Sequence, residues 1–165
     1  ITPHNIDSPI IDLMNVKYVL SFSDLNSPRF EKVFQEGQTK VYKNKNMLPR
    51  AFFVLRAVES NRNQETVDEM FESDLSQTAF AQNLNLLTSN LVVGKATIVN
   101  YSENVIKIET ENTGDGFLVL TDAYYPAWKA EVDGKLTQVY KVDYAFRGVF
   151  IPAGRHKVVF YDTLF

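Results

Sequence analysis

The chain has 165 residues, a formal net charge of −3 at pH 7 and no cysteine. Its length predicts a single soluble domain over residues 1–165, and the 45% apolar and 22% charged contents are those of a globular protein. The lack of cysteine excludes a disulfide framework and a thiolate metal site, and the acidic balance argues against a nucleic-acid partner, which requires a basic face.

The first part of the chain predicts short strands. Pro9 and the apolar residues after it predict a helical turn, and residues 16–22 form an apolar run typical of a buried strand. Gly37 marks the turn of a hairpin within residues 30–42. The apolar start of the run 51–59 predicts a strand that is buried on both faces.

One helix is expected, over residues 63–73. Val67, Met70 and Phe71 recur at helical spacing and predict its apolar face. Asn63 is expected to be the N-cap of this helix.

Two halves are expected, residues 1–92 and residues 96–165. The polar stretch 74–95 has no clear period and is expected to be irregular. The apolar runs 51–55 and 117–120 predict that both halves share one core, because each run is expected to be buried on both faces.

From residue 96 onward the chain is almost entirely of strand type. Ile106 and Ile108 alternate with charged residues, as in a strand with one solvent-exposed face, and Asp133-Gly134 predicts a type I′ turn. Strands separated by turns every 8–12 residues or so predict an antiparallel sandwich. The expected fold class is mainly β: a jelly-roll-like antiparallel β-sandwich with one short helix and an α+β N-terminal half that shares its core.

The segment from Asp122 to Trp128 is the strongest candidate for ligand recognition. The aromatic side chains of Tyr124, Tyr125 and Trp128 offer faces for sugar rings, and Asp122 offers an acceptor for hydroxyl groups. Packing is the alternative for each aromatic residue. It is favoured for Trp128, which alternates in phase with Ala130 on one face of a strand, and it is evenly balanced with recognition for the two tyrosines.

Arg147 is the fifth candidate ligand-binding residue, because it interrupts an apolar strand. A guanidinium group there can bind a carboxylate or phosphate, and the favoured alternative is an ion pair with a structural acid, Asp143 or Asp133. His156 is expected to be a packed or turn histidine, since no second ligand stands at metal-binding spacing. No catalytic residue, metal site or cofactor is predicted.

Several short motifs follow one another over most of the chain and are densest after Gly116. They are VKYV (16–19), NMLPRAF (46–52), GFLVL (116–120), YYP (124–126), WKA (128–130), VDG (132–134), YAFRG (144–148) and PAG-x-H (152–156). This succession resembles the YfhO family of bacterial membrane proteins, specifically the soluble domain near their C-terminus. The chain departs from the family pattern at Ala127, where Gly is usual, and in residues 160–163, which lack a frequent Pro.

The resemblance implies a polytopic membrane protein similar to lipid-linked-sugar glycosyltransferases of the GT-C type. In such enzymes the catalytic carboxylate lies on a loop among the membrane helices, so no catalytic residue is carried over to this chain. The resemblance implies an extracytoplasmic domain at the bacterial cytoplasmic membrane, with the transmembrane helices of its own protein as partners.

These observations leave three functions open. The first is non-catalytic recognition of a glycan or lipid-linked sugar by the five candidate residues, without a cofactor. The second is a purely structural or interaction module that packs on the membrane helices. The third and least favoured is a hydrolase, which requires two carboxylates roughly 5–9.5 Å apart in a concave site.

Overall fold

The structure is a computed structural model that describes residues 6–61, 63–84 and 90–164. The chain divides into two compact units, Ile1–Pro49 and Arg50–Phe165. The division lies just before the strand that begins at Ala51, which pairs with a strand of the second unit.

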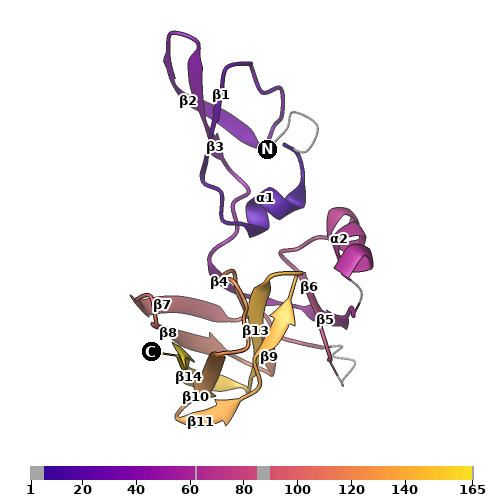
Figure 1. Cartoon of the computed structure of the whole chain (residues 1–165), viewed down its shortest axis with the longest axis vertical. Coiled ribbons are helices and arrows are strands. Elements are labelled where there is room, and N and C mark those ends of the chain that lie inside the picture. Colours follow the sequence, from indigo (N-terminus) through magenta and orange to yellow (C-terminus); the bar gives the residue numbers. More distant parts are fainter. Residues whose placement is uncertain (1–5, 62, 85–89, 165) are drawn as a thin grey trace. The chain divides into compact units, whose positions relative to one another are not determined.

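Unit 1, residues 1–49, is a three-stranded antiparallel sheet preceded by a short helix (Figure 1). Its elements, with sheet order β1-β3-β2, are α1 (Pro9–Leu13), β1 (Tyr18–Ser21), β2 (Phe30–Glu36) and β3 (Thr39–Asn44). Ser8 caps α1 by accepting a hydrogen bond of 3.2 Å from the backbone N–H of Ile10. Gly37 adopts a φ of 55° in the turn between β2 and β3. The predicted helical turn and hairpin are confirmed. The strand predicted over residues 16–22 is β1, but it is not buried as expected, since Val19 is its only buried residue.

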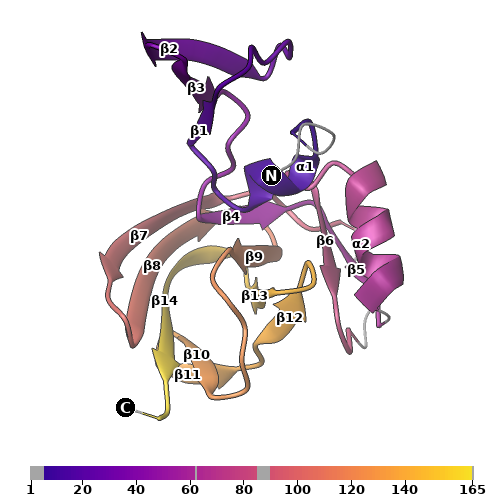
Figure 2. The same ribbon diagram turned by 45° about the horizontal axis from the view of Figure 1, so that its top comes forward.

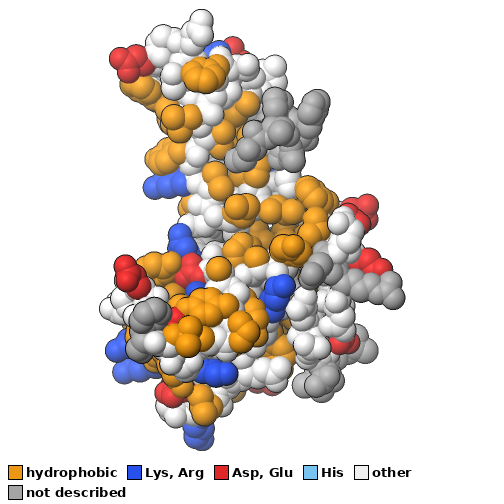
Figure 3. All heavy atoms as spheres, viewed as in Figure 1, with side chains coloured by type: hydrophobic (Ala, Val, Ile, Leu, Met, Phe, Trp, Pro, Cys, Tyr) orange, Lys and Arg blue, Asp and Glu red, His pale blue; other side chains and the backbone are white. Residues whose placement is uncertain are grey.

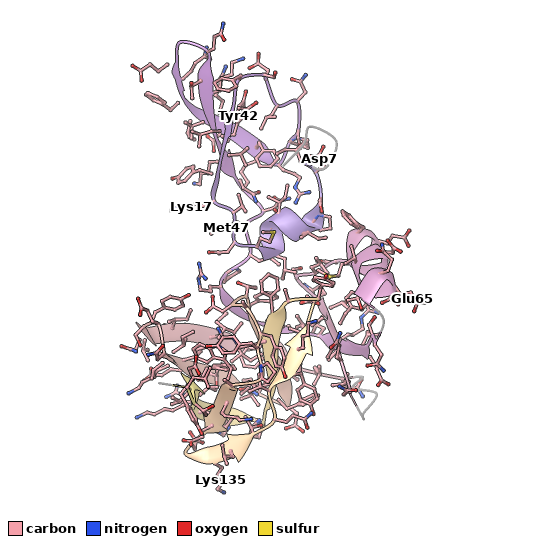
Figure 4. All side chains as sticks on the ribbon, in the orientation of Figure 1. Asp7, Lys17, Tyr42, Met47, Glu65 and Lys135 are labelled. Carbon is pink, nitrogen blue, oxygen red and sulfur yellow. The ribbon has the colours of Figure 1, made fainter. Side chains whose placement is uncertain are left out.

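A small core lies on one face of this sheet. Val19, Phe30 and Tyr42 are buried in it, and Figure 4 places Tyr42 on the sheet. The Tyr42 hydroxyl accepts a hydrogen bond of 3.3 Å from the backbone N–H of Leu25 and donates one of 3.1 Å to the Asp24 carboxylate. These bonds hold the β1–β2 loop over the core.

Unit 2, residues 50–165, contains two sheets that pack on each other (Figure 2). The five-stranded sheet has the order β11-β10-β14-β8-β7, with β7 (Lys95–Tyr101), β8 (Val105–Asn112), β10 (Trp128–Val132), β11 (Lys135–Thr137) and β14 (Gly154–Asp162). The six-stranded sheet has the order β4-β9-β13-β12-β6-β5, with β4 (Ala51–Val54), β5 (Arg56–Glu59), β6 (Thr78–Ala81), β9 (Gly116–Leu120), β12 (Tyr140–Val142) and β13 (Phe146–Ile151).

The core of unit 2 forms where alternating residues of the two sheets meet. Ile106 and Ile108 of β8 lie in one buried cluster with Leu118 and Leu120 of β9 and with Phe160 of β14. The charged residues between the two isoleucines and after them are exposed, as the alternation predicts. The antiparallel, mainly β sandwich expected from the sequence is confirmed.

The predicted strand over 51–59 is divided at Leu55 into β4 and β5. β4 pairs with β9, whereas β5 pairs in parallel with β6. The backbone N–H groups of Leu55 and Arg56 both donate to the carbonyl oxygen of Gln77, over 2.9 and 3.0 Å. Because β4 and β5 stand at opposite ends of the strand order but follow each other in the chain, the six-stranded sheet curls round on itself.

The stretch 74–95 is not wholly irregular, contrary to the prediction. It contains β6, whose four residues are all buried. β6 pairs with β5 and, through Ala81, with Val142 of β12. A run of four residues is too short to show a period, and its strand is stabilised by partners distant in the sequence. Residues 85–89 of this stretch lie outside the described residues.

The predicted helix is α2 (Asn63–Glu72), which follows β5 and lies beside it and β6 (Figures 1 and 2). Met70 is buried and Val67 is half-buried, but Phe71 is 49% exposed, so the apolar face is narrower than predicted. Asn63 is predicted to cap this helix, and its side chain lies outside the described part of the chain. The capping role stays a prediction.

The turn between β10 and β11 has the predicted type. Asp133 and Gly134 have φ values of 52° and 78°, as both central residues of a type I′ turn require. Lys135 follows and extends away from the sandwich at the tip of this hairpin (Figure 4).

Candidate binding site

Strand pairing in the six-stranded sheet brings Arg147 beside the segment that follows β9. Arg147 of β13 is the register partner of Leu120, the last residue of β9. After Leu120 the backbone N–H of Thr121 donates to the carbonyl oxygen of Arg50 over 2.9 Å. This contact directs the chain so that Asp122 lies next to the Arg147 guanidinium.

A cavity of about 530 Å³ lies at this rim of the sandwich. Four of the five predicted ligand-binding residues line it, namely Asp122, Tyr125, Trp128 and Arg147. The other lining residues are Tyr101, Ser102, Glu103, Ile106 and Ala123. Tyr124 is not among them. Its backbone N–H donates to the carbonyl oxygen of Ala145 over 2.7 Å. This bond attaches the β9–β10 loop to the turn between β12 and β13.

The Asp122 carboxylate is shared by two arginines. Its Oδ1 accepts hydrogen bonds from Arg50 Nη1 over 2.7 Å and from the Tyr101 hydroxyl over 3.1 Å. Its Oδ2 lies 3.5 Å from Arg147 Nη2. Because Oδ1 has two donors, the orientation of the carboxylate is set, and Oδ2 is directed to the Arg147 side.

Arg147 is a buried cation, with a side chain only 3% exposed. Burial lowers the pKa of its guanidinium to about 10, and the Asp122 carboxylate opposes that shift, so Arg147 is protonated at neutral pH. Its Nε donates to the Asp122 carbonyl oxygen over 3.3 Å. The ion-pair partner is therefore Asp122, and the expectation of Asp143 or Asp133 is wrong, because the β9–β13 pairing decides which acid lies nearby.

Trp128 is a core residue, as the alternation of β10 indicates. It is 5% exposed and belongs to the sandwich core. The guanidinium carbon of Arg147 lies 3.8 Å from the centroid of its ring, so one ring face is covered by a cation. The packing interpretation of Trp128 is confirmed, and its ring is not a free stacking surface.

Tyr125, like Tyr101, is an exposed aromatic residue of the pocket. Its side chain is 37% exposed, and its ring meets Trp128 edge-on with centroids 5.9 Å apart. The Tyr125 hydroxyl donates to the carboxylate of Asp162, the last residue of β14. Tyr125 thus combines an open ring surface with a fixed hydroxyl group.

Two residues of the site were not predicted from the sequence, Arg50 and Tyr101. Arg50 precedes β4, and its guanidinium carbon lies 5.3 Å from the centroid of the Tyr101 ring. Neither residue stands near Asp122 in the chain, and local sequence carries no indication of their proximity. Arg50 does stand within the NMLPRAF motif (46–52), which is the only feature that marks it.

His156 has the structural surroundings expected of it. Its Nδ1 lies 2.7 Å from Asp133 Oδ2, and its Nε2 lies 3.2 Å from the carbonyl oxygen of Ala153. The hydrogen bond with Asp133 raises the pKa of the imidazole. Within residues 6–61, 63–84 and 90–164 there is no group of three or more His, Asp or Glu side chains placed to hold a metal ion.

The fold and the recess at its rim define a β-sandwich domain with an aromatic and charged pocket. The family model described as the bacterial membrane protein YfhO matches residues 58–161, more than half of the chain. The chain belongs to the YfhO family. None of the curated proteins and none of the solved structures matches it. No helix in the described ranges is both long and apolar enough to cross a membrane.

Proposed function

We propose that this chain is a glycan-recognition domain of a multi-pass membrane protein similar to lipid-linked-sugar glycosyltransferases. Membership of a bacterial membrane protein family supports the membrane context. In this proposal the domain lies at the extracytoplasmic face, where glycans are found, and it binds a glycan or the sugar of a lipid-linked donor. The chemical step belongs to other parts of the protein.

The observation that carries this proposal is the rim pocket. It combines an exposed tyrosine ring, a carboxylate and one guanidinium group around about 530 Å³, which is the scale of small-ligand pockets. Sugars are bound by this combination, because aromatic faces contact the apolar faces of the ring while charged groups bind the hydroxyls. Asp122, Tyr125 and Arg147 supply these groups.

A glycan-array screen of the 165-residue chain, followed by titration of the hits, tests this function. Trp128 is the single tryptophan, so its fluorescence reports binding at the pocket itself. Tyr125→Ala is expected to abolish binding, because the exposed ring is lost. Tyr124→Ala is the matched control, since Tyr124 does not line the pocket. The absence of any hit, or equal loss in both variants, contradicts the proposal.

A second candidate function, an interaction module for the membrane part of the same protein, is favoured by unit 1. One face of its sheet leaves large apolar side chains exposed, since Tyr18, Leu20 and Phe34 are 49%, 69% and 56% exposed. Figure 3 shows hydrophobic side chains over these strands. Tyr18 and Leu20 alternate along β1, and Phe34 and Leu20 are both partners of Val41. An exposed apolar face of this kind is typical of an interaction surface.

The two functions are separable by mutation. Leu20→Glu in the complete membrane protein is expected to lower its thermal stability if the unit 1 face packs on the membrane helices, while glycan binding by the isolated chain stays unchanged. Lys43→Glu is a control for added negative charge on the same face, because Lys43 is the partner of Tyr18. Equal stability of the Leu20→Glu and wild-type proteins contradicts this second function.

A further inference from the structure

Two buried polar atoms at the rim pocket lack a hydrogen bond within the described part of the chain. They are Arg147 Nη1, a donor, and Asp122 Oδ2, an acceptor. Both residues line the pocket, and their side chains are only 3% and 10% exposed. Buried polar atoms in folded proteins are nearly always hydrogen-bonded, so an unpaired donor and acceptor at one pocket indicate a place for a further polar group.

The two atoms belong to one incomplete ion pair. Asp122 Oδ2 lies 3.5 Å from Arg147 Nη2, which is longer than a charge-assisted hydrogen bond of about 2.7–2.9 Å. Nη1 is on the same planar guanidinium group, so it lies within a few ångströms of Oδ2. A single small group can therefore contact both atoms.

The charges around the pocket decide which group fits. Arg50 and Arg147 are balanced by Asp122 and by Asp162, which binds the Tyr125 hydroxyl, and the exposed Glu103 adds a negative charge to the pocket lining. An oxyanion would pair with Arg147 but would be repelled by the Asp122 carboxylate. An ammonium group would pair with Asp122 but would be repelled by Arg147. A hydroxyl group both donates and accepts, so it satisfies both atoms.

We infer that the pocket binds a neutral sugar through one hydroxyl group, which accepts a hydrogen bond from Arg147 Nη1 and donates one to Asp122 Oδ2. This inference rests on the proposed function and names its ligand class. The sugar ring packs on Tyr125, because Arg147 lies over the ring of Trp128 and Arg50 lies over the ring of Tyr101. Sugars that carry a carboxylate or phosphate at this position are excluded by Asp122.

Entry of the hydroxyl requires a local movement. Neither Arg147 Nη1 nor Asp122 Oδ2 is accessible to solvent in this conformation. Residues 121–127 must therefore shift before the contact forms, and the hydrogen bond from the Tyr125 hydroxyl to Asp162 opposes that shift. Binding is expected to be limited by this opening step, which slows association relative to a rigid open pocket.

The test uses the 165-residue chain with three probes at equal ionic strength: methyl β-D-glucopyranoside, methyl β-D-glucuronopyranoside and glucose 1-phosphate. Neutral methyl glycosides of galactose, mannose and N-acetylglucosamine complete the panel. Trp128 fluorescence and calorimetry report binding. At least one neutral glycoside is expected to bind, and the glucuronide and glucose 1-phosphate are expected to bind at least tenfold more weakly than it does.

Variants of the two polar residues separate recognition from packing. Asp122→Asn and Arg147→Lys are each expected to weaken binding of the neutral glycoside at least tenfold, with circular dichroism as the check of folding. If Arg147→Lys does not fold, the affinity of Asp122→Asn for the neutral glycoside tests the inference. Arg155→Lys is the matched control, because Arg155 is 81% exposed and pairs with Glu111 on a different surface. Tyr125→Phe is expected to accelerate association, since it removes the bond to Asp162.

The outcomes distinguish the inference from the function on which it rests. Tighter binding of the charged sugars, or unchanged affinity in Asp122→Asn, overturns the inference and leaves glycan recognition in place. Binding of none of the sugars, with the glycan array also negative, overturns the proposed function and the inference together.

Discussion

Arg147 covers the face of Trp128, with its guanidinium carbon 3.8 Å from the centroid of the indole ring. The same guanidinium carbon lies 5.7 Å from the centroid of the Phe160 ring. The cation is therefore held between the sandwich core and the rim pocket. This position links the proposed binding site to stability, because substitutions at the pocket alter the surroundings of a buried charge.

Asp122→Ala is expected to lower the free energy of unfolding by about 3–5 kcal/mol, because it removes the anionic partner of a buried arginine. Arg50 is 40% exposed and regains solvent, whereas Arg147 does not. Urea unfolding measures the change. Glu111→Ala is the control, since Glu111 and Arg155 form an exposed pair, and such pairs contribute little. Similar losses in both variants contradict the buried-charge argument.

Asp143 is expected to make the protein less stable as the pH rises. It is buried, accepts a hydrogen bond of 2.8 Å from the backbone N–H of Phe80, and has a second carboxylate oxygen without a partner among the described residues. Burial raises its pKa to about 7 from an ordinary value of 3.8, although the bond from Phe80 opposes this. Because the folded state binds the proton more tightly, the stabilisation is complete below pH 3.8 and is lost as the pH rises through about 7.

Asp143→Asn isolates this effect. The variant keeps an oxygen acceptor for Phe80 and suits the positive φ of 48° at this position. The unfolding free energy of the wild type minus that of the variant is expected to fall as the pH rises from 3.8 to about 7, the two pKa values of Asp143. A difference that is constant over that range contradicts the prediction.

His156 is expected to stabilise the fold at low pH through its bond with Asp133. The pKa of the imidazole is raised above its ordinary value of 6.5 by that hydrogen bond. The stabilisation is therefore complete below pH 6.5 and is lost as the pH rises through the folded-state pKa. A histidine titration by NMR measures the pKa directly. Asp133→Asn is expected to lower it, and an unchanged pKa in the variant contradicts the assignment.

Gly148→Ala is expected to destabilise unit 2 by about 1–3 kcal/mol, as overpacking of a core does. A Cβ atom at this position lies 2.6 Å from Phe117 Cε1 and 2.8 Å from Val142 Cγ1, which is closer than atoms can approach. Thermal unfolding measures the loss. The double variant Gly148→Ala/Phe117→Leu is expected to show a non-additive, smaller loss than the sum of the two single changes. Strict additivity would contradict the contact with Phe117.

A fragment of residues 50–165 is expected to unfold in one cooperative transition, whereas residues 96–165 are not expected to fold alone. The shorter fragment lacks β4, and Ala51 and Phe53 of β4 belong to the core cluster of the sandwich. Circular dichroism during heating distinguishes the two. A cooperative transition of 96–165 would show that the strands from β7 onward need no contribution from the residues before them.

Features that depend on neighbours in the chain could be predicted. The alternation around Ile106 and Ile108 identified the buried face of β8. The pair Asp133-Gly134 identified the type of the turn between β10 and β11. Both could be predicted because side-chain direction and backbone φ are local properties. Trp128 was correctly weighted toward packing for the same reason. Four of the five predicted ligand-binding residues line one pocket, because three of them stand in one short segment.

Features that depend on pairing over long distances could not be predicted. β6 was missed because its four residues show no period, and its partners lie in β5 and β12. The assignment of Asp143 or Asp133 to Arg147 failed because the pairing of β9 with β13, and not distance along the chain, places Asp122 beside Arg147. Arg50 and Tyr101 were missed because 71 and 20 intervening residues separate them from the carboxylate that they bind.

The sequence by itself determined the mainly β class, the alternation of β8, the tight turns and the family, since these follow from local patterns and motifs. Only the tertiary structure decided that Arg147 pairs with Asp122 and that Arg50 binds the same carboxylate. It also decided that the Tyr125 ring is exposed, whereas Arg147 covers one face of the Trp128 ring. The reason is physical: a strand's alternation specifies which side chains are buried, but the register between strands decides which charges lie within bonding distance.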